Sequence, residues 1–283
     1  MKLHQVLTNG AFFRKVAVIV CKAVNGSTLC LTLVCCAALQ SSPVLAYCPH
    51  RSFNEQAVID SVVDGDTIRL GNHQLVRLIG VNTPEIHYDG TPSEPMAQAA
   101  KDFLTRLLHD QKSVGLVFEP DTHDRYGRLL AHVFYSSNGS HSPVDIQQKI
   151  LENGMGYWIA IPPNIAYLNC YQDAEARARQ HHLGLWSRAY ISPKNAADKT
   201  ALVPGFQRLR GKITAVYRTR KSVWLKFNNQ VALRIAVKDI HNFQMAALYA
   251  LKGTTLTARG WLYKRDNKLI MPISLPDDME LQP

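Results

Sequence analysis

Side chains suited to metal and phosphate chemistry gather in one short stretch, which begins with an Asp-Gly-Asp-Thr turn between two apolar runs. The turn predicts a β-hairpin that carries Asp66 at its tip. The next apolar run contains Arg77 and leads to Asn82, Thr83 and, after a proline, Glu85. We expect these side chains and the Thr83 carbonyl to converge on one point. Oxygen ligands of this kind suit Ca²⁺ or Mg²⁺, and an arginine fork suits a phosphate.

A third motif, Asp124-Arg125-Tyr126-Gly127-Arg128, stands just before an apolar run over residues 129–135. Each motif has a more ordinary interpretation when it is taken alone. Asp-Gly-Asp-Thr is more often a simple hairpin turn than a metal site, and Thr-Pro-Glu more often starts a helix or a loop. The three motifs in one chain, in this order, favour a chemical role.

Together these motifs resemble those of the thermonuclease (staphylococcal nuclease-like) family, and the likeness covers residues 53–186. The resemblance implies an enzyme that cleaves DNA and RNA with little sequence preference and leaves 3′-phosphates, without a small-molecule cofactor. It also implies residue roles: Ca²⁺ ligands at Asp66, Asn82 and the Thr83 backbone, a phosphate clamp at Arg77 and Arg128, a water-activating carboxylate at Glu85, and nucleotide contacts at Arg125 and Tyr126.

One position departs from the family pattern. The residue before Thr-Pro-Glu is usually an aspartate in the family, and here it is Asn82. Its amide oxygen can still coordinate Ca²⁺, but one full charge is lost, so we expect weaker Ca²⁺ binding and leave Mg²⁺ open as the ion. The alternative function is an inactive nuclease-like module that binds nucleic acid or protein. Arg77, Glu85 and Arg128 are all present, which favours the enzyme.

The elements that must position these residues follow the order strand, strand, strand, helix, strand, strand over residues 53–135. The helix is predicted to begin near Ser93, because apolar residues then recur at three- and four-residue spacing. This order predicts a mostly β, α+β fold: an OB-type five-stranded barrel with added helices. A short helix capped by Asp145 and another over about 165–182 would complete a nuclease-like domain over residues 47–187.

The same order of elements is repeated after a polar linker at residues 188–204, with a helix over about 239–251. We therefore expect a second OB-like barrel over residues 205–283. Alternation along its strands puts one set of aromatic and basic side chains on a single outward face, which resembles a stacking surface for single-stranded nucleic acid. The set comprises Trp224, Lys226, Arg234, Lys238, Arg259, Trp261 and Tyr263. The alternative is that Trp224 and Trp261 pack under the helix or against the first domain.

The first 46 residues predict a signal peptide. Four basic residues precede an apolar run of about a dozen residues, and Val-Leu-Ala46 fits a cleavage site. The run is shorter than the ~20 residues that span a bilayer, although an uncleaved inner-membrane anchor remains the alternative. The prediction is export to the periplasm or the medium.

Cleavage would leave two of the six cysteines, Cys48 and Cys170. An even pair in an exported chain predicts one disulfide, and two unpaired cysteines are the alternative. The formal net charge of +10 would fall to +6. A basic chain favours a polyanionic partner, either nucleic acid or a membrane surface.

Overall fold

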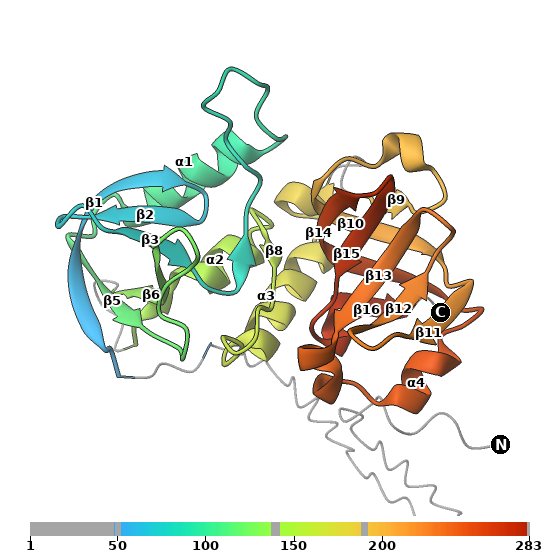
Figure 1. Cartoon of the computed structure of the whole chain (residues 1–283). Helices are drawn as coiled ribbons and strands as arrows, with labels where there is room; N and C mark the ends of the chain where they lie inside the picture. Colours follow the sequence, from blue (N-terminus) through green and yellow to red (C-terminus); the bar gives the residue numbers. More distant parts are fainter. Residues whose placement is uncertain (1–47, 49–51, 137–141, 188–191, 282–283) are drawn as a thin grey trace, which may run out of the picture. The chain divides into compact units, whose positions relative to one another are not determined.

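A five-stranded barrel forms the first half of the computed structural model, which describes Cys48 and residues 52–136, 142–187 and 192–281 (Figure 1). Its strands follow the order β3-β2-β1-β5-β6, and a parallel pairing of β3 with β6 closes the barrel. The strands are β1 (Glu55–Asp64), β2 (Thr67–Leu70), β3 (Leu75–Leu78), β5 (Ser113–Val117) and β6 (Leu129–Tyr135), with β7 (Val144–Asp145) extending the sheet beside β6.

The long strand β1 makes closure of this barrel feasible. Its first half pairs with β5 and its second half pairs with β2, with register shifts after Ile59 and Val62. Such irregularities bend a strand and increase its twist. Alternate residues of the barrel strands point into the interior. Ile68 on β2, Val76 on β3 and Leu116 on β5 are fully buried there.

Helices and a two-stranded ribbon complete the first half: α1 (Ala97–Leu108), α2 (Ile146–Glu152), α3 (Leu168–Gln180) and the pair β4 (Val81–Asn82) with β8 (Tyr157–Trp158). The predicted start of α1 near Ser93 is wrong. Glu94 is held in a loop closure instead, since its backbone N–H donates to the Glu85 carbonyl at 2.9 Å and its carboxylate accepts from the Glu85 N–H at 3.0 Å.

A chain of buried polar groups connects the barrel to α2 and α3. His132 on β6 contacts Glu119 at 2.5 Å through Nε2 and the Tyr171 hydroxyl at 2.7 Å through Nδ1. The Tyr171 hydroxyl in turn donates to Asp145 at 3.1 Å. Asp145 also caps α2 by accepting from the Gln148 N–H at 2.8 Å. Burial raises the pKa of Asp145 to about 7, because removal from water disfavours the charged carboxylate.

The second half forms a second, barrel-like sheet in the order β11-β12-β13-β15-β14-β10-β9, with β16 beside β14 (Figure 1). This confirms the predicted fold class of two OB-like barrels. The elements are β9 (Lys194–Asn195), β10 (Gly205–Lys212), β11 (Ala215–Arg218), β12 (Ser222–Lys226), β13 (Val231–Ala236), α4 (Met245–Ala250), β14 (Thr255–Arg265), β15 (Lys268–Pro272) and β16 (Met279–Leu281), with 3₁₀ turns at Lys199–Ala201, Val237–Asn242 and Pro276–Asp278. A further 3₁₀ turn, Gly184–Ser187, follows α3 in the first half.

Two expectations for this half differ from the structure. The segment predicted as a linker contributes β9, which pairs in parallel with β10, and Ala196 beside it is fully buried. The predicted helix over 239–251 is divided, because a 3₁₀ turn ends at Asn242 and α4 begins only at Met245.

Arg259 on β14 is buried against Glu175 and Trp158 of the first half, so its predicted place on an exposed face is wrong. Residues 45–283 form one unit, and within it Arg259 donates to both oxygens of Glu175 at 2.9 and 3.0 Å. Only 3% of Arg259 and 1% of Glu175 are exposed. The guanidinium also lies 4.1 Å above the Trp158 ring.

Glu280 and Arg179 extend this buried cluster. Glu280 accepts from Arg259 at 2.7 Å and pairs with Arg179 at 2.8 Å. Burial alone would raise the pKa of Glu280, but the hydrogen bonds and positive charge of these two arginines lower it to about 2. Its ionised form therefore stabilises the fold above its ordinary pKa, and this contribution is lost as the pH falls towards about 2.

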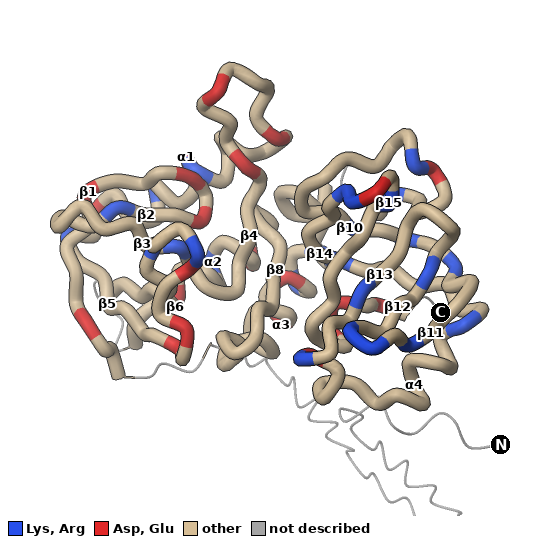
Figure 2. Tube along the Cα trace, in the orientation of Figure 1, with Lys and Arg blue, Asp and Glu red and all other residues tan. Residues whose placement is uncertain are grey.

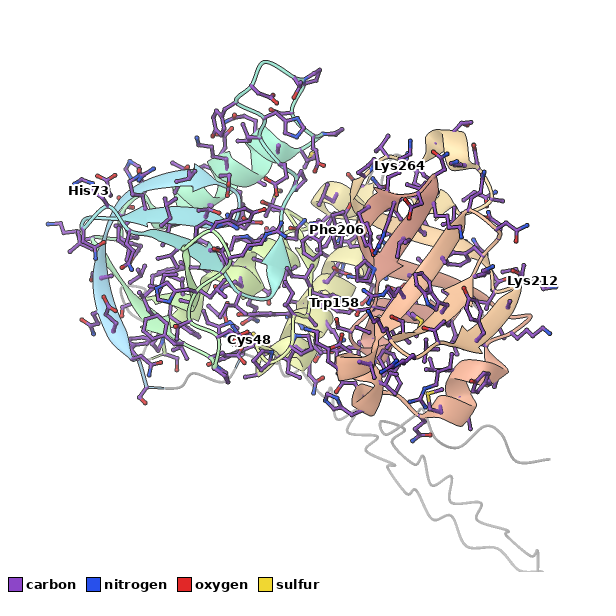
Figure 3. All side chains as sticks on the ribbon, in the orientation of Figure 1. Cys48, His73, Trp158, Phe206, Lys212 and Lys264 are labelled. Carbon is purple, nitrogen blue, oxygen red and sulfur yellow. A yellow bond between two sulfur atoms is a disulfide. The ribbon has the colours of Figure 1, made fainter. Side chains whose placement is uncertain are left out.

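Cys48 and Cys170 form a disulfide, which is the pair that the sequence predicts. Cys48 is almost fully buried and belongs to the core of the first barrel (Figure 3). The predicted signal peptide lies outside the described residues. Among the residues that are described, no helix is long and apolar enough to cross a membrane.

The Arg259 cluster gives a testable prediction for stability. Arg259→Ala should lower the free energy of unfolding by about 3 kcal/mol, because it removes the second-barrel partner of the buried Glu175 carboxylate. Urea unfolding at neutral pH measures the change. The matched control is Arg210→Ala, which removes an exposed arginine from β10 and should cost no more than about 0.5 kcal/mol. Equal losses in the two variants would contradict a structural role for the buried pair.

Candidate active site

Asp66 lies at the tip of the β1–β2 hairpin, where its carboxylate connects two distant segments. Oδ2 accepts from the Thr83 backbone N–H at 2.9 Å and lies 2.9 Å from Arg77 Nη2. Oδ1 accepts from the Thr67 hydroxyl at 3.2 Å. Only 3% of Asp66 is exposed, so this carboxylate sits in a largely water-excluded position beside a fixed cation.

Arg77 on β3 organises the chain that follows it. Its Nη1 donates to the carbonyls of Leu78 and Val81 at 2.7 and 2.8 Å, and its Nη2 donates to Asn82 Oδ1 at 3.2 Å. A guanidinium keeps its charge and offers five donors in a fixed plane. The bend between β3 and β4 is therefore closed around Arg77, and the Asp66 and Asn82 side-chain oxygens both contact its Nη2.

Gly80 forms the sharp point of that bend. Its φ is +81°, a conformation that L side chains rarely adopt. A Cβ at this position would also overlap the Tyr171 ring, which belongs to α3. The Gly80 carbonyl accepts from the Ile159 N–H at 3.1 Å, which connects the bend to the segment after β8.

Glu85 comes two residues after Thr83 and opens a loop that projects beside α1 (Figure 1). The residue is exposed as a whole, but partial burial of its carboxyl group, together with repulsion from Asp66 and Asp64, raises the pKa of Glu85. The loop is fixed at its base by the pairing of Glu85 with Glu94 and higher up by Tyr88, whose hydroxyl donates to the Val63 carbonyl at 2.9 Å. The carboxylate therefore stands on a supported loop beside Asp66.

Arg128 is placed by the turn before β6. Its Nε donates to Asp124 Oδ2 at 2.7 Å, and its backbone N–H donates to Asp124 Oδ1 at 3.0 Å. The parallel register pairs Arg77 with Leu130, which lies two residues beyond Arg128. Arg128 itself lies in the turn before β6, so this turn opens beside the strand that carries Arg77.

Arg125 and Tyr126 project from the same turn. The Tyr126 side chain is 68% exposed, and the Arg125 guanidinium lies 4.7 Å from the centre of its ring. An exposed ring beside a cation can stack on a base, which is the geometry that nucleotide contact requires.

The predicted metal ligands offer oxygen atoms of the right kind for a hard divalent cation. Asp66 and Asn82 present side-chain oxygens that contact the same guanidinium nitrogen, and the Thr83 carbonyl follows directly in the chain. Asp64 adds negative charge: its pKa is raised by burial and by repulsion from Asp66. Within the described ranges, no group of three or more His, Cys, Asp or Glu residues has the geometry of a metal site. An ion here would depend on the amide and backbone oxygens beside one carboxylate.

A hollow of about 290 Å³ borders this site. Asn82 and Pro84 line it from the first half, and Phe206 and Arg208 line it from β10. Its position beside a predicted metal ligand gives a substrate room to approach Asn82.

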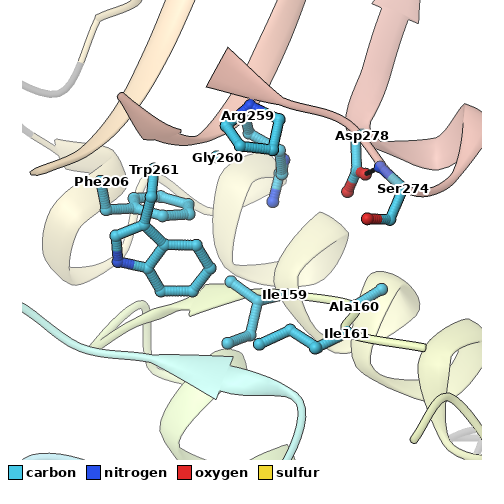
Figure 4. Close-up of a pocket in the computed structure, with 10 residues that line it drawn as sticks. Ile159, Ala160, Ile161, Phe206, Arg259, Gly260, Trp261, Ser274 and Asp278 are labelled. Atoms are coloured by element: carbon cyan, nitrogen blue, oxygen red, sulfur yellow. Dashed lines mark hydrogen bonds between the residues drawn. The ribbon is translucent and has the colours of Figure 1, made fainter. Parts of the chain in front are cut away.

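Trp261 does not lie beside Trp224; it lines a separate pocket. It packs edge-on against Phe206, with ring centres 5.3 Å apart, and lines a pocket of about 220 Å³ with Ile159 and Ile161 of the first half (Figure 4). Trp261 is 41% exposed and shares this pocket with residues of the first half, so it is neither fully buried nor on the strand that carries Trp224. The remaining predicted face residues are distributed over neighbouring elements: Trp224 and Lys226 on β12, Arg234 on β13, Lys238 in the following 3₁₀ turn and Tyr263 on β14.

Sequence reasoning did not assign roles to three carboxylates that shape the site. Asp64 accepts from the Asp66 N–H at 3.1 Å, Asp124 holds Arg128, and Glu94 supports Glu85. The first two stand inside the motifs themselves, so the sequence contained that signal. No local signal marked Glu94, because its contact with Glu85 depends on the path of the loop between them.

Comparison with known proteins agrees with this geometry. A model of the staphylococcal nuclease homologue family matches residues 75–188. The thermonuclease of Staphylococcus intermedius is 33% identical over 137 residues, which cover 47% of this chain and 77% of that protein. The thermonuclease of Staphylococcus hyicus is 34% identical over 138 residues, covering 47% and 78%. The endonuclease YncB of Bacillus subtilis strain 168 is 28% identical over 149 residues, covering 50% and 67%.

These relatives match over most of their own length, and the matched family region contains Arg77, Asn82, Thr83, Glu85 and Arg128. The family resemblance that the three motifs predict is therefore confirmed. This chain belongs to the staphylococcal nuclease homologue family.

Proposed function

We propose that this chain is an exported, Ca²⁺-dependent endonuclease that cleaves DNA and RNA with little sequence preference and leaves 3′-phosphates. Family membership supports the nuclease activity, since the relatives carry the names thermonuclease and endonuclease. The observation that carries the proposal is the contact of Asp66 and Asn82 with Arg77, together with the hydrogen bond from the Thr83 N–H to Asp66, with Glu85 beside them.

The residues suit phosphodiester hydrolysis because each meets one need of the reaction. Negative charge grows on the non-bridging oxygens as water attacks, and preorganised cations lower the energy of that state. Arg128, and any donor of Arg77 not held by Asp66, Asn82 and the Leu78 and Val81 carbonyls, would contact those oxygens. A Ca²⁺ bound to Asp66, Asn82 and the Thr83 carbonyl would add positive charge next to them.

Glu85 supplies the remaining function, which is to orient a water molecule and take its proton. A carboxylate acts as a general base when it is ionised and within hydrogen-bonding distance of the water. The loop contacts of Glu94 and Tyr88 hold this carboxylate beside Asp66. The site thus separates a group that activates water from the groups that bind phosphate.

The first prediction concerns Glu85. Glu85→Gln keeps the shape of the side chain but removes the base, so cleavage of plasmid and single-stranded DNA should fall about 10²- to 10⁴-fold. The matched control is Asp89→Asn, an isosteric change at the exposed part of the same loop, which should stay within about twofold of the parent. Initial rates of digestion with Ca²⁺, Mg²⁺ or chelator measure both variants. Nucleic-acid binding without cutting by the parent under every cation would instead support an inactive binding module.

A second prediction concerns Asn82. Asn82→Asp restores a charge next to the ion, and charges of this kind interact strongly at short range, so we expect Ca²⁺ to bind about tenfold more tightly or better. Calorimetric titration of Ca²⁺ into each variant reports binding directly. Asn72→Asp adds the same charge at an exposed turn of the same barrel and should change little. Micromolar Ca²⁺ saturation of the parent, unchanged in Asn82→Asp, would rule out a weakened site.

Export rests on the apolar run before Ala46 and on the Cys48–Cys170 disulfide, which is a bond of oxidising compartments. We expect the exported protein to begin at Tyr47 and to resist thiol labelling until it is reduced. N-terminal sequencing and alkylation followed by mass spectrometry measure these two properties. A chain that keeps residues 1–46 and stays with the inner membrane would support the anchor instead.

A further inference from the structure

One outward face of the second barrel aligns aromatic and basic side chains across three strands. Tyr217 on β11 pairs in register with Trp224 on β12, and Trp224 pairs with Arg234 on β13. Residues paired in this way point to the same side of a sheet. The orientation is fixed by the opposite side, where Val223 and Leu233 are fully buried in the core.

The next row of register partners on the same face contains a cation, Lys226. Lys226 stands between Ala215 and Ala232 in the register, so both of its partners on the neighbouring strands have small side chains. Its ammonium group lies 5.4 Å from the centre of the Tyr217 ring. We call Tyr217, Trp224, Lys226 and Arg234 the basic-aromatic face. The Tyr217 side chain is 38% exposed, and the other three are partly exposed.

Positive charge continues at the edge of this face. The turn from β11 to β12 carries exposed Arg220 and Lys221 next to Arg218, and neither the turn nor strands β11, β12 and β13 contain an acidic residue (Figure 2). Aromatic rings beside cations, on strands without acidic residues, suit a ligand that has flat bases and a negatively charged backbone.

Charge is divided unequally between the two halves of the chain. Residues 205–283 contain 14 basic and five acidic residues, a formal net charge of +9. Residues 47–204 contain 14 basic and 17 acidic residues, a formal net charge of −3. The attraction of this chain for a polyanion therefore originates mainly in the second barrel.

We propose that the basic-aromatic face binds single-stranded DNA or RNA, with bases stacked on Tyr217 and Trp224 and phosphates paired with Lys226 and Arg234. A duplex hides its base faces and would leave these rings unused, whereas an unpaired strand offers both stacking and charge. The face lies outside the region matched by the nuclease family. Binding here does not require cleavage, so this proposal and the proposed function can fail separately.

Binding is best measured on residues 47–283 carrying Glu85→Gln, with a fluorescent 20-nucleotide oligothymidylate and anisotropy at several salt concentrations. Trp224→Ala should weaken binding about tenfold or more, and Trp224→Phe should restore it to within about threefold. The double change Lys226→Ala with Arg234→Ala should lower the slope of log affinity against log salt by about 1.4.

The matched control removes the same charge elsewhere. Lys112→Ala with Lys252→Ala takes one exposed lysine from each barrel, outside the face, and should not weaken binding beyond the threefold margin set for Trp224→Phe. An equal loss in the control, or full affinity in Trp224→Ala, would overturn the proposal. So would a duplex of the same length that binds more tightly and ignores Trp224→Ala.

A second measurement covers the case in which a variant does not fold. Irradiation of the Glu85→Gln chain with an oligonucleotide containing 5-iodouracil should attach the base to Tyr217 or Trp224, as read by mass spectrometry. Attachment only to residues of the first barrel would overturn the proposal.

Discussion

The Arg77 guanidinium is the constraint around which the nuclease site is built. It is a permanent charge with only 12% of its side chain exposed, so it must keep several acceptors close by. Two of them are the Leu78 and Val81 carbonyls, which the bend after β3 turns inward. The others are Asp66 and Asn82, which come from separate elements. Folding thus places oxygen atoms that suit a metal ion next to Arg77, a cation that suits a phosphate.

Local sequence predicted the parts of this arrangement that depend on local chemistry. Asp-Gly-Asp-Thr produced the hairpin, and alternation identified the strands of both barrels. The position of Asn82 near Asp66 could be anticipated because only 15 residues and one hairpin separate the two positions. Arg128 followed from its glycine turn, although Asp124, which fixes it, was overlooked in the same motif.

Long-range packing explains where the structure departs from the predictions. Alternation correctly put Arg259 opposite the residues that face the second core, but it could not reveal that Glu175, 84 residues earlier, covers that position. The start of α1 was misplaced because Glu94 takes Glu85 as its partner instead of entering the helix. Trp261 lies apart from Trp224 because β13 and β15 separate their strands in the sheet, and its ring packs on Phe206 of β10. In each case the partner lies on another element, so no local pattern encodes it.

The contact between Gly80 and Tyr171 has a consequence for how this protein loses structure. The bend that presents Asn82 rests on the ring of Tyr171, which also anchors the buried chain through His132 and Asp145. Opening of α3 would remove the support of the bend and break that chain in the same event. The bend and α3 therefore belong to one cooperative unit. Loss of the site requires this whole unit to open, and that opening costs more free energy than the fraying of a single loop.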